Sequence, residues 1–246
     1  LDSNVQLKPS GVEWIGDIPE HWEVRRLKFL CHNLNEQTTE KLPGETYIAL
    51  EHVESWTGRI SLPDEEIAFD SQVKRFQPGD VLFGKLRPYL AKVTRPPIAG
   101  VCVGEFLVLR VTGNVSPEFL EQKLRSKRVI DLINSSTFGA KMPRADWTFI
   151  GNLKLAYPSA DEQRGILEHI QVKSAEIDQA ITRAQREIEL MREYRIRLIA
   201  DVVTGKVDVR GIEVPDVAEE ERLALGGDTD ESDNMIDDDL EKEVEQ

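Results

Sequence analysis

The sequence of 246 residues predicts an α+β protein, and three observations along the chain carry that prediction. Segments rich in β-branched and aromatic residues alternate with turn signals over residues 1–156, which predicts a mixed sheet with accompanying helices. Residues 157–206 have a regular apolar spacing, which predicts a long coiled-coil-forming helix. Residues 207–246 are strongly acidic and contain no aromatic residue, which predicts a mostly disordered C-terminal extension.

Besides a short strand at residues 152–158, three strands and a helix are predicted within the first part. Residues 46–54 alternate in polarity, residues 81–86 follow the turn signal Gln-Pro-Gly-Asp at 77–80, and residues 101–111 are rich in β-branched side chains. The last of these segments fits either one strand or a strand pair. The Ser-Pro pair at residues 116–117 marks the start of a helix that carries one apolar face.

The strongest local signal opens the long helix. Ser159 and Glu162 have the spacing of a capping box, in which the first residue caps the helix and the second lies at its third position. No proline follows before Val203, and Gly205 is placed to end the helix. About 44 residues at 1.5 Å per residue would give a rod of roughly 65 Å.

Apolar residues recur along this helix in alternating steps of four and three, which is typical of the seam between two paired helices. The predicted helix-pairing residues are Ile177, Ile181, Ala184, Ile188, Met191, Leu198 and Val202. Arg195 also falls on the seam, where it either sets the register of the pair or extends its charge into solvent. A narrow seam of this kind needs a partner helix.

Charge is distributed unevenly along the chain. The formal net charge is −14, but residues 67–155 carry 14 basic and 7 acidic side chains, whereas residues 207–246 carry 3 basic and 16 acidic ones. The overall acidity therefore does not argue against nucleic-acid binding, because binding depends on where Lys and Arg gather.

Motifs of catalysis are missing from the sequence. A DNA methyltransferase needs an Asn/Asp-Pro-Pro-aromatic motif, and the only Pro-Pro pair, Pro96-Pro97, lacks those neighbours. No P-loop motif is present. Glu121-Gln-Lys123 has the letters of a nuclease motif, but its surroundings predict a solvated helix face. We therefore expect a non-catalytic binding and assembly protein.

Cysteine content and hydropathy indicate the compartment. Cys31 and Cys102 are too few for a disulfide framework, which predicts a reducing, cytoplasmic environment. The four histidines show no paired ligand spacing, so no metal site is predicted. No apolar run reaches the ~18 residues that a membrane span needs.

Several segments, in sequence order, resemble the specificity (S) subunit of type I restriction-modification systems. Residues 8–28 (KPSGVEWIGDIPEHWEVRRLK) are similar to the opening of its target recognition domain. Residues 157–178 (beginning YPSADEQRG) are similar to the Pro-x-x-x-Glu-Gln entry into its conserved helical region. The other similar segments are residues 79–93, 100–110, 135–147 and 198–211. The likeness covers residues 8 to about 215, and its specificity lies in the order and spacing of the segments.

The resemblance implies which roles belong to this chain and which belong to its partner subunits. Residues 1–156 would be a target recognition domain that reads one half of a bipartite DNA site, and residues 157–206 the conserved spacer helix. The partners would be methylation (M) subunits using S-adenosylmethionine and a restriction (R) subunit using ATP and Mg²⁺, so no cofactor is expected on this chain. A standard S subunit has two recognition domains and two helices, whereas this chain has one of each. We expect either a half-subunit that pairs with a second copy or the C-terminal half of a longer subunit.

Six residues are candidates for DNA contact. They are Lys85, Arg87, Tyr89, Lys92, Lys141 and Arg144. The first four lie on or just after one predicted strand, where the cations would meet phosphates or guanine edges and the tyrosine would pack on a sugar or base. The alternative is an ordinary solvated edge with the tyrosine in the core. The last two lie in a loop beside Gly139, and the alternative for them is a structural loop that packs on the helical region.

Two other functions remain open from the sequence. One is a non-catalytic coiled-coil adaptor whose globular part binds protein rather than DNA. The other is a self-contained nuclease, for which plasmid cleavage by the purified chain with Mg²⁺ would be the test.

Overall fold

The computed structural model describes residues 5–62, 71–137, 139 and 141–211. The chain divides into two compact units, Leu1–Asp178 and Gln179–Gln246, and each is described by itself. Most of the predicted acidic extension lies beyond residue 211 and therefore outside the described residues. Among the helices that are described, none is both long enough and apolar enough to cross a bilayer.

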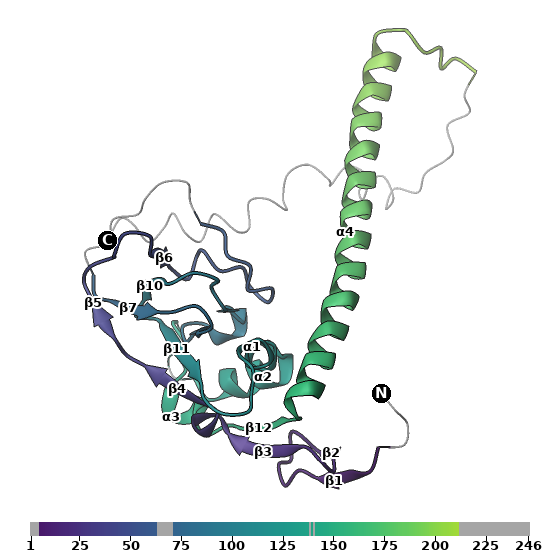
Figure 1. The fold of residues 1–246 in the computed structure, drawn as a ribbon. Coiled ribbons are helices and arrows are strands. Elements are labelled where there is room, and N and C mark those ends of the chain that lie inside the picture. The colour runs from purple at the N-terminus through teal and green to yellow at the C-terminus, as the bar shows by residue number, and fades with distance from the viewer. Residues whose placement is uncertain (1–4, 63–70, 138, 140, 212–246) are drawn as a thin grey trace. The chain divides into compact units, whose positions relative to one another are not determined.

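Short strands form four sheets in the first unit (Figure 1). The two larger sheets have the strand orders β5-β7-β10-β6 and β4-β11-β8-β9, and the two smaller ones pair β1 with β2 and β12 with β3. Among these strands β10 and β6 run parallel, and the other pairs are antiparallel. The strands are β1 (Leu7–Pro9), β2 (Asp17–Pro19), β3 (Glu23–Arg26), β4 (Cys31–Leu34), β5 (Gln37–Thr38), β6 (Thr46–Ile48), β7 (Val73–Phe76), β8 (Val81–Gly84), β9 (Val93–Thr94), β10 (Gly100–Val103), β11 (Phe106–Val111) and β12 (Lys154–Tyr157).

The strand predictions are confirmed in part. β6 is shorter than the predicted strand over residues 46–54, because the chain turns after Ile48. In that turn the His52 N–H donates to the Ala49 carbonyl at 3.2 Å, and the His52 ring Nδ1 accepts from the Ala49 N–H at 3.2 Å. The segment over residues 101–111 is a pair of strands, β10 and β11, which belong to different sheets.

Helices and short 3-10 turns complete the fold. They are η1 (Leu27–Phe29), η2 (Pro88–Leu90), α1 (Pro117–Arg125), α2 (Lys127–Ser135), α3 (Trp147–Ile150) and α4 (Ala160–Val203). Ser116 caps α1 as predicted, since its hydroxyl accepts from the Phe119 N–H at 3.1 Å. The predicted apolar face is divided between α1 and α2. The break is at Ser126, whose backbone is extended and whose hydroxyl donates to the Lys123 carbonyl at 2.7 Å.

The core has two parts, separated by the sheet that contains β8 and β11. Val81 and Phe83 of β8 belong to the larger cluster, which also includes the buried faces of α1 and α2, whereas Leu82 belongs to the smaller cluster. Leu107 and Val108 of β11 alternate in the same way. Because both faces of these strands are buried, their sequences are continuous apolar runs rather than alternating ones.

The long helix α4 has 44 residues and begins and ends where the sequence predicts. At its start the Glu162 N–H lies 3.4 Å from the Ser159 hydroxyl. At its end Gly205 has φ +74°, a left-handed conformation that favours glycine. The N–H groups of Gly205 and Lys206 donate to the Val202 and Asp201 carbonyls at 3.0 and 2.8 Å, which satisfies two of the last carbonyls of the helix.

Candidate nucleic-acid interface

The first candidate loop follows β8 and has an unusual backbone. Arg87 precedes η2 and has φ +49°, and Ala91 follows it with φ +49°. A left-handed backbone is unfavourable for residues other than glycine by roughly 1–2 kcal/mol, so surrounding contacts must hold it in place. Pro88 supports the turn because its ring fixes the first position of η2.

The second candidate loop provides those contacts. Leu86 and Arg144 form an isolated antiparallel bridge. The Arg87 N–H donates to the Pro143 carbonyl at 2.8 Å, and the Ala145 N–H donates to the Lys85 carbonyl at 2.9 Å. Two segments that lie more than fifty residues apart in sequence are therefore one structural feature. We call Lys85, Arg87, Tyr89, Lys141 and Arg144 the two-loop surface.

Glu105, in the turn between β10 and β11, ties both loops to the sheet. Its carbonyl accepts from the Lys85 N–H at 2.9 Å, and its carboxylate lies 3.3 Å from the Arg144 Nε. The sequence analysis did not identify this residue. The available signal was the Gly104-Glu105 pair inside a run of strand-forming residues, which marks a turn but does not reveal the neighbouring loops.

The side chains of the two-loop surface are accessible and mostly cationic. Arg87, Lys141 and Arg144 are exposed and Lys85 is half-buried, while Tyr89 is 45% exposed rather than in the core. Within the described part of the chain, neither Lys85 nor Arg87 forms an ion pair. Burial lowers the pKa of Lys74, and the positive charge of Lys85 lowers it further. Such a surface can bind an anion without first breaking a salt bridge at Lys85 or Arg87.

Lys92, the remaining candidate on the first loop, has a partner inside the protein. Its ammonium donates to the Leu50 carbonyl at 2.8 Å, and burial lowers its pKa. This contact joins the residue before β9 to the turn after β6. The DNA contact predicted for Lys92 stays a prediction, and we leave this residue out of the two-loop surface.

The predicted helix-pairing residues lie on the surface of α4. Ile177, Ile181, Ala184, Ile188, Met191 and Leu198 are exposed, and Val202 is half-exposed. Further apolar residues are exposed outside the stripe toward the C-terminal end of the helix, Tyr194 and Ile199 beside the stripe and the other three on the outer side of the helix. They are Leu190, Tyr194, Ile196, Ile199 and Val203. Exposed apolar area of this extent marks an interaction surface.

The start of α4 is joined to the sheets by polar side chains that the sequence analysis did not assign. Gln163 is buried, and its amide donates to the carbonyls of Asn114 and Pro158 at 2.8 and 2.9 Å and accepts from the Ser116 N–H at 2.9 Å. This one side chain links the N-terminal ends of α1 and α4. The Glu-Gln of the family motif is visible in the sequence, but nothing in the spacing indicates which groups it contacts.

Glu162 makes a second connection, to the segment between β2 and β3. Its carboxylate accepts from the Trp22 Nε1–H at 3.0 Å and lies 2.7 Å from the His21 Nε2. The side chain of Glu162 thus has partners outside its own helix as well as a place in the capping box.

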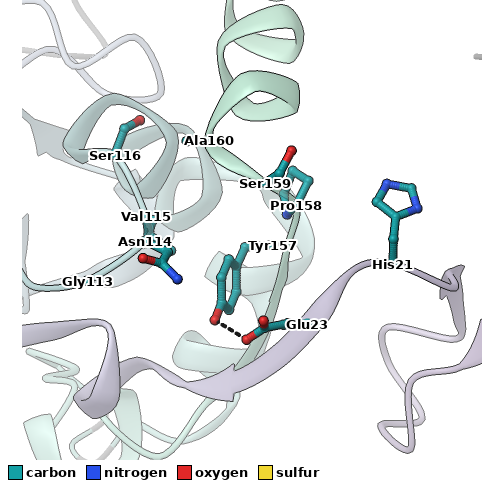
Figure 2. Close-up of a pocket in the computed structure, with 10 residues that line it drawn as sticks. All are labelled: His21, Glu23, Gly113, Asn114, Val115, Ser116, Tyr157, Pro158, Ser159 and Ala160. Carbon is teal, nitrogen blue, oxygen red and sulfur yellow. Dashed lines mark hydrogen bonds between the residues drawn. The ribbon is translucent and has the colours of Figure 1, made fainter.

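A pocket of about 580 Å³ lies at this junction, and Figure 2 shows its lining residues. The Tyr157 hydroxyl of β12 donates to the Glu23 carboxylate of β3 at 2.7 Å. This hydrogen bond lowers the pKa of Glu23, while burial and the same bond raise the pKa of Tyr157 to about 12. The helix caps Ser116 and Ser159 line the same pocket (Figure 2). We assign no ligand to it.

Comparison with known proteins finds similarity to proteins of type I restriction systems. No family model matches the chain. The chain is 21% identical over 211 residues to the EcoDI specificity subunit of a type I restriction enzyme from Escherichia coli, covering 84% of this chain and 47% of that protein. The chain therefore spans about half the length of this curated relative.

Solved structures agree with this match in fold. The HsdS subunit from Thermoanaerobacter tengcongensis has a TM-score of 0.58 at 22% identity, over 81% of this chain and 52% of that one. A chain from a structural study of complex assembly and conformational transition in the type I R-M system has a TM-score of 0.60 at 23% identity, over 81% and 53% of the two chains. The resemblance predicted from the sequence is therefore confirmed: the chain matches a type I specificity subunit in sequence over most of its length and shares the fold of HsdS subunits.

Proposed function

We propose that this chain is a non-catalytic DNA-recognition subunit of a type I restriction-modification complex, which reads one half of a bipartite site through the two-loop surface. The observation that carries the proposal is the backbone pairing of the two basic loops at Leu86 and Arg144. The pairing joins the two segments that carry the basic residues and the exposed Tyr89, and such residue types are suited to phosphates and base edges. The relatedness to a specificity subunit supports the same function.

Helix α4 supplies the second part of the proposal. Its apolar stripe pairs with a second recognition half or a second copy of the chain, which would set the spacing between two half-sites. A two-helix pair covers a narrow seam, whereas near Met191–Val203 exposed apolar residues also lie outside the seam. The additional area is where we place the M subunits, with the R subunit joining the assembled complex. S-adenosylmethionine, ATP and Mg²⁺ would be bound by those partners and not by this chain.

Gel-shift titration of the chain assembled with its M subunits tests the DNA-recognition part. Arg87→Ala should lower affinity for the cognate duplex by a factor of about 5–150 if Arg87 contacts a base, corresponding to roughly 1–3 kcal/mol. If Arg87 contacts a phosphate, affinity should fall for all sequences and the salt dependence should become shallower by about one charge. Lys154→Ala removes an exposed lysine from β12, outside the two-loop surface, and is the matched control.

Either effect at Arg87, with Lys154→Ala unchanged, supports the proposal. An assembled complex that shows no preference for a bipartite duplex, and equal affinity for both variants, would favour the protein-binding adaptor instead.

A further inference from the structure

One acidic side chain contacts the two-loop surface. The Arg144 Nε donates to the Glu105 carboxylate at 3.3 Å, and the two side chains are 51% and 30% exposed, respectively. Glu105 lies in the turn between β10 and β11. A Cβ added at Gly104, its neighbour in that turn, would meet no atom within 4 Å apart from its chain neighbours. The carboxylate therefore belongs to an open turn at the protein surface.

Main-chain hydrogen bonds hold this Arg–Glu pair in place. The Glu105 carbonyl accepts from the Lys85 N–H at 2.9 Å, and the Lys85 carbonyl accepts from the Ala145 N–H at 2.9 Å. Arg144 itself forms a backbone bridge with Leu86. The two charged residues are thus positioned by the main chain, and their side chains remain available for other contacts. A recognition site held in this way is preorganised.

The pair has unused hydrogen-bonding groups of both kinds. A guanidinium has five N–H donors, and only the Nε–H of Arg144 is engaged with Glu105. Within the described part of the chain, Nη1 and Nη2 of Arg144 have no hydrogen-bond partner, and neither does Oε1 of Glu105. The pair therefore offers a fork of donors next to an acceptor.

A carboxylate in this place is unfavourable for contact with the DNA backbone, because it repels phosphates. It cannot accept a hydrogen bond from a phosphate either. In the major groove, the groups that donate to a carboxylate are the amino groups of cytosine and adenine. An exposed Glu105 beside Arg144 is therefore suited to a base edge and unsuited to a surface that binds phosphates alone.

The pattern of donors and acceptors matches one base pair. In the major groove guanine presents the acceptors N7 and O6, and its paired cytosine presents the N4 amino donor beside them. The Nη groups of Arg144 can donate to both guanine acceptors, while Oε1 of Glu105 accepts from the cytosine amino group. An A·T pair has the adenine amino donor between two acceptors, so the fork of Arg144 would face a donor there.

We propose that Arg144 and Glu105 together read one G·C pair of the half-site in the major groove, with Arg144 on the guanine and Glu105 on the cytosine. The contact between the two side chains orients the guanidinium and leaves the second carboxylate oxygen for the base. This inference rests on the proposed function, because it names a base pair that the two-loop surface recognises.

Selection from a library of duplexes with randomised half-sites, using the chain assembled with its M subunits, tests the proposal. The native complex should select G·C at one position of the half-site. Arg144→Ala should reduce that preference by a factor of about 5–150, the discrimination that one good base contact provides. Glu105→Ala should reduce the preference at the same position about fivefold or more and leave the other positions unchanged. Its exposed side chain makes no main-chain contact that the fold needs.

Two modified duplexes test each contact separately. Replacing the selected cytosine with 2-pyrimidinone removes the N4 amino group, and replacing the selected guanine with 7-deazaguanine removes the N7 acceptor. The native complex should bind each duplex about fivefold or more weakly. The first replacement should have little further effect on Glu105→Ala, and the second little further effect on Arg144→Ala, because each variant has already lost the contact. Equal losses in the native complex and the variant would show that the side chain does not touch that base.

Glu118→Ala is the matched control. Its carboxylate lies 3.3 Å from the Arg95 Nη1, outside the two-loop surface, and Arg95 keeps a second partner in Glu121. This variant should select the same sequences as the native complex. If the native complex selects no bipartite sequence, the proposed function itself fails. If it selects one, but Glu105→Ala keeps the native base preferences or changes them at a different position from Arg144→Ala, the joint reading of a G·C pair is wrong and DNA recognition stands.

Discussion

The two parts of α4 interact by different means. Residues 160–178 include Glu162 and Gln163, whose polar atoms have specific partners in other elements. Residues 179–203 present a repeating apolar stripe, and the ion pairs Arg186–Glu189 and Asp201–Lys206 join residues that are close in sequence. The hydrogen bonds of Glu162 and Gln163 hold the start of α4 against specific neighbours. The repeating apolar stripe determines only how a partner helix can pack against it. One continuous helix thus combines a structural attachment with a surface for association.

The largest effect is expected at the attachment. Gln163→Leu leaves two carbonyls and the Ser116 N–H without their partner in a buried setting, which should lower the free energy of unfolding by about 2–4 kcal/mol. Gln185→Leu makes the same change at an exposed position of the same helix and should stay within about 0.5 kcal/mol. Urea unfolding followed by circular dichroism measures both. Equal effects would mean that the buried amide is not what secures the start of α4.

Substitutions in the helix-pairing seam should weaken self-association and leave the stability of the monomer nearly unchanged. Ile181→Gln combined with Ile188→Gln removes two exposed apolar residues from the stripe, so self-association measured by sedimentation should weaken at least about tenfold. The unfolding free energy of the dilute monomer should change by less than about 0.5 kcal/mol, because neither side chain is buried in the single chain. A large loss of monomer stability would show that these residues pack inside the monomer.

A smaller effect is expected at Trp22. Trp22→Phe keeps the ring but removes the Nε1–H that donates to Glu162, which should cost about 1 kcal/mol of unfolding free energy. Combining it with Glu162→Gln should give less than the sum of the single changes, since both act on one contact. Strict additivity would indicate that the two side chains stabilise the protein separately.

Tyr157 gives a pH dependence of stability. Its pKa is raised from 10 to about 12 in the folded protein, so folding favours the neutral phenol. The resulting stabilisation is complete below pH 10 and is lost as the pH rises toward 12. The unfolding free energy of the native protein should therefore fall more steeply in this interval than that of Tyr157→Phe.

Phenolate absorbance provides the check on that assignment. The difference between the native protein and Tyr157→Phe should show one tyrosine that ionises near pH 12. A difference spectrum that titrates at the ordinary value of about 10 would contradict both the burial of the phenol and its contact with Glu23 as causes of the raised pKa.

The local elements were more predictable than the contacts between them. Ser159 and Gly205 mark the ends of α4 because capping acts within a few residues, and the same holds for Ser116 at α1. The two candidate loops were predicted as separate features. Their pairing depends on sheet topology that brings residues 85–87 to residues 143–145, and no local pattern encodes it.

Burial of polar residues was also beyond the reach of the sequence. Gln163 looks like any helical glutamine until its three partners are known, and Lys92 looks like any basic loop residue until Leu50 is found beside it. Trp56 illustrates the converse, since a tryptophan ordinarily predicts core and this one is nearly half exposed. Each case depends on long-range neighbours rather than on spacing.

The bonds between the two loops at Leu86, Arg87 and Arg144 come from the main chain. Main-chain bonds tolerate many different side chains, so the residues displayed there can be exchanged while the frame that displays them persists. Under the proposed function, point substitutions at these positions would change the DNA sequence preference without rebuilding the protein around them.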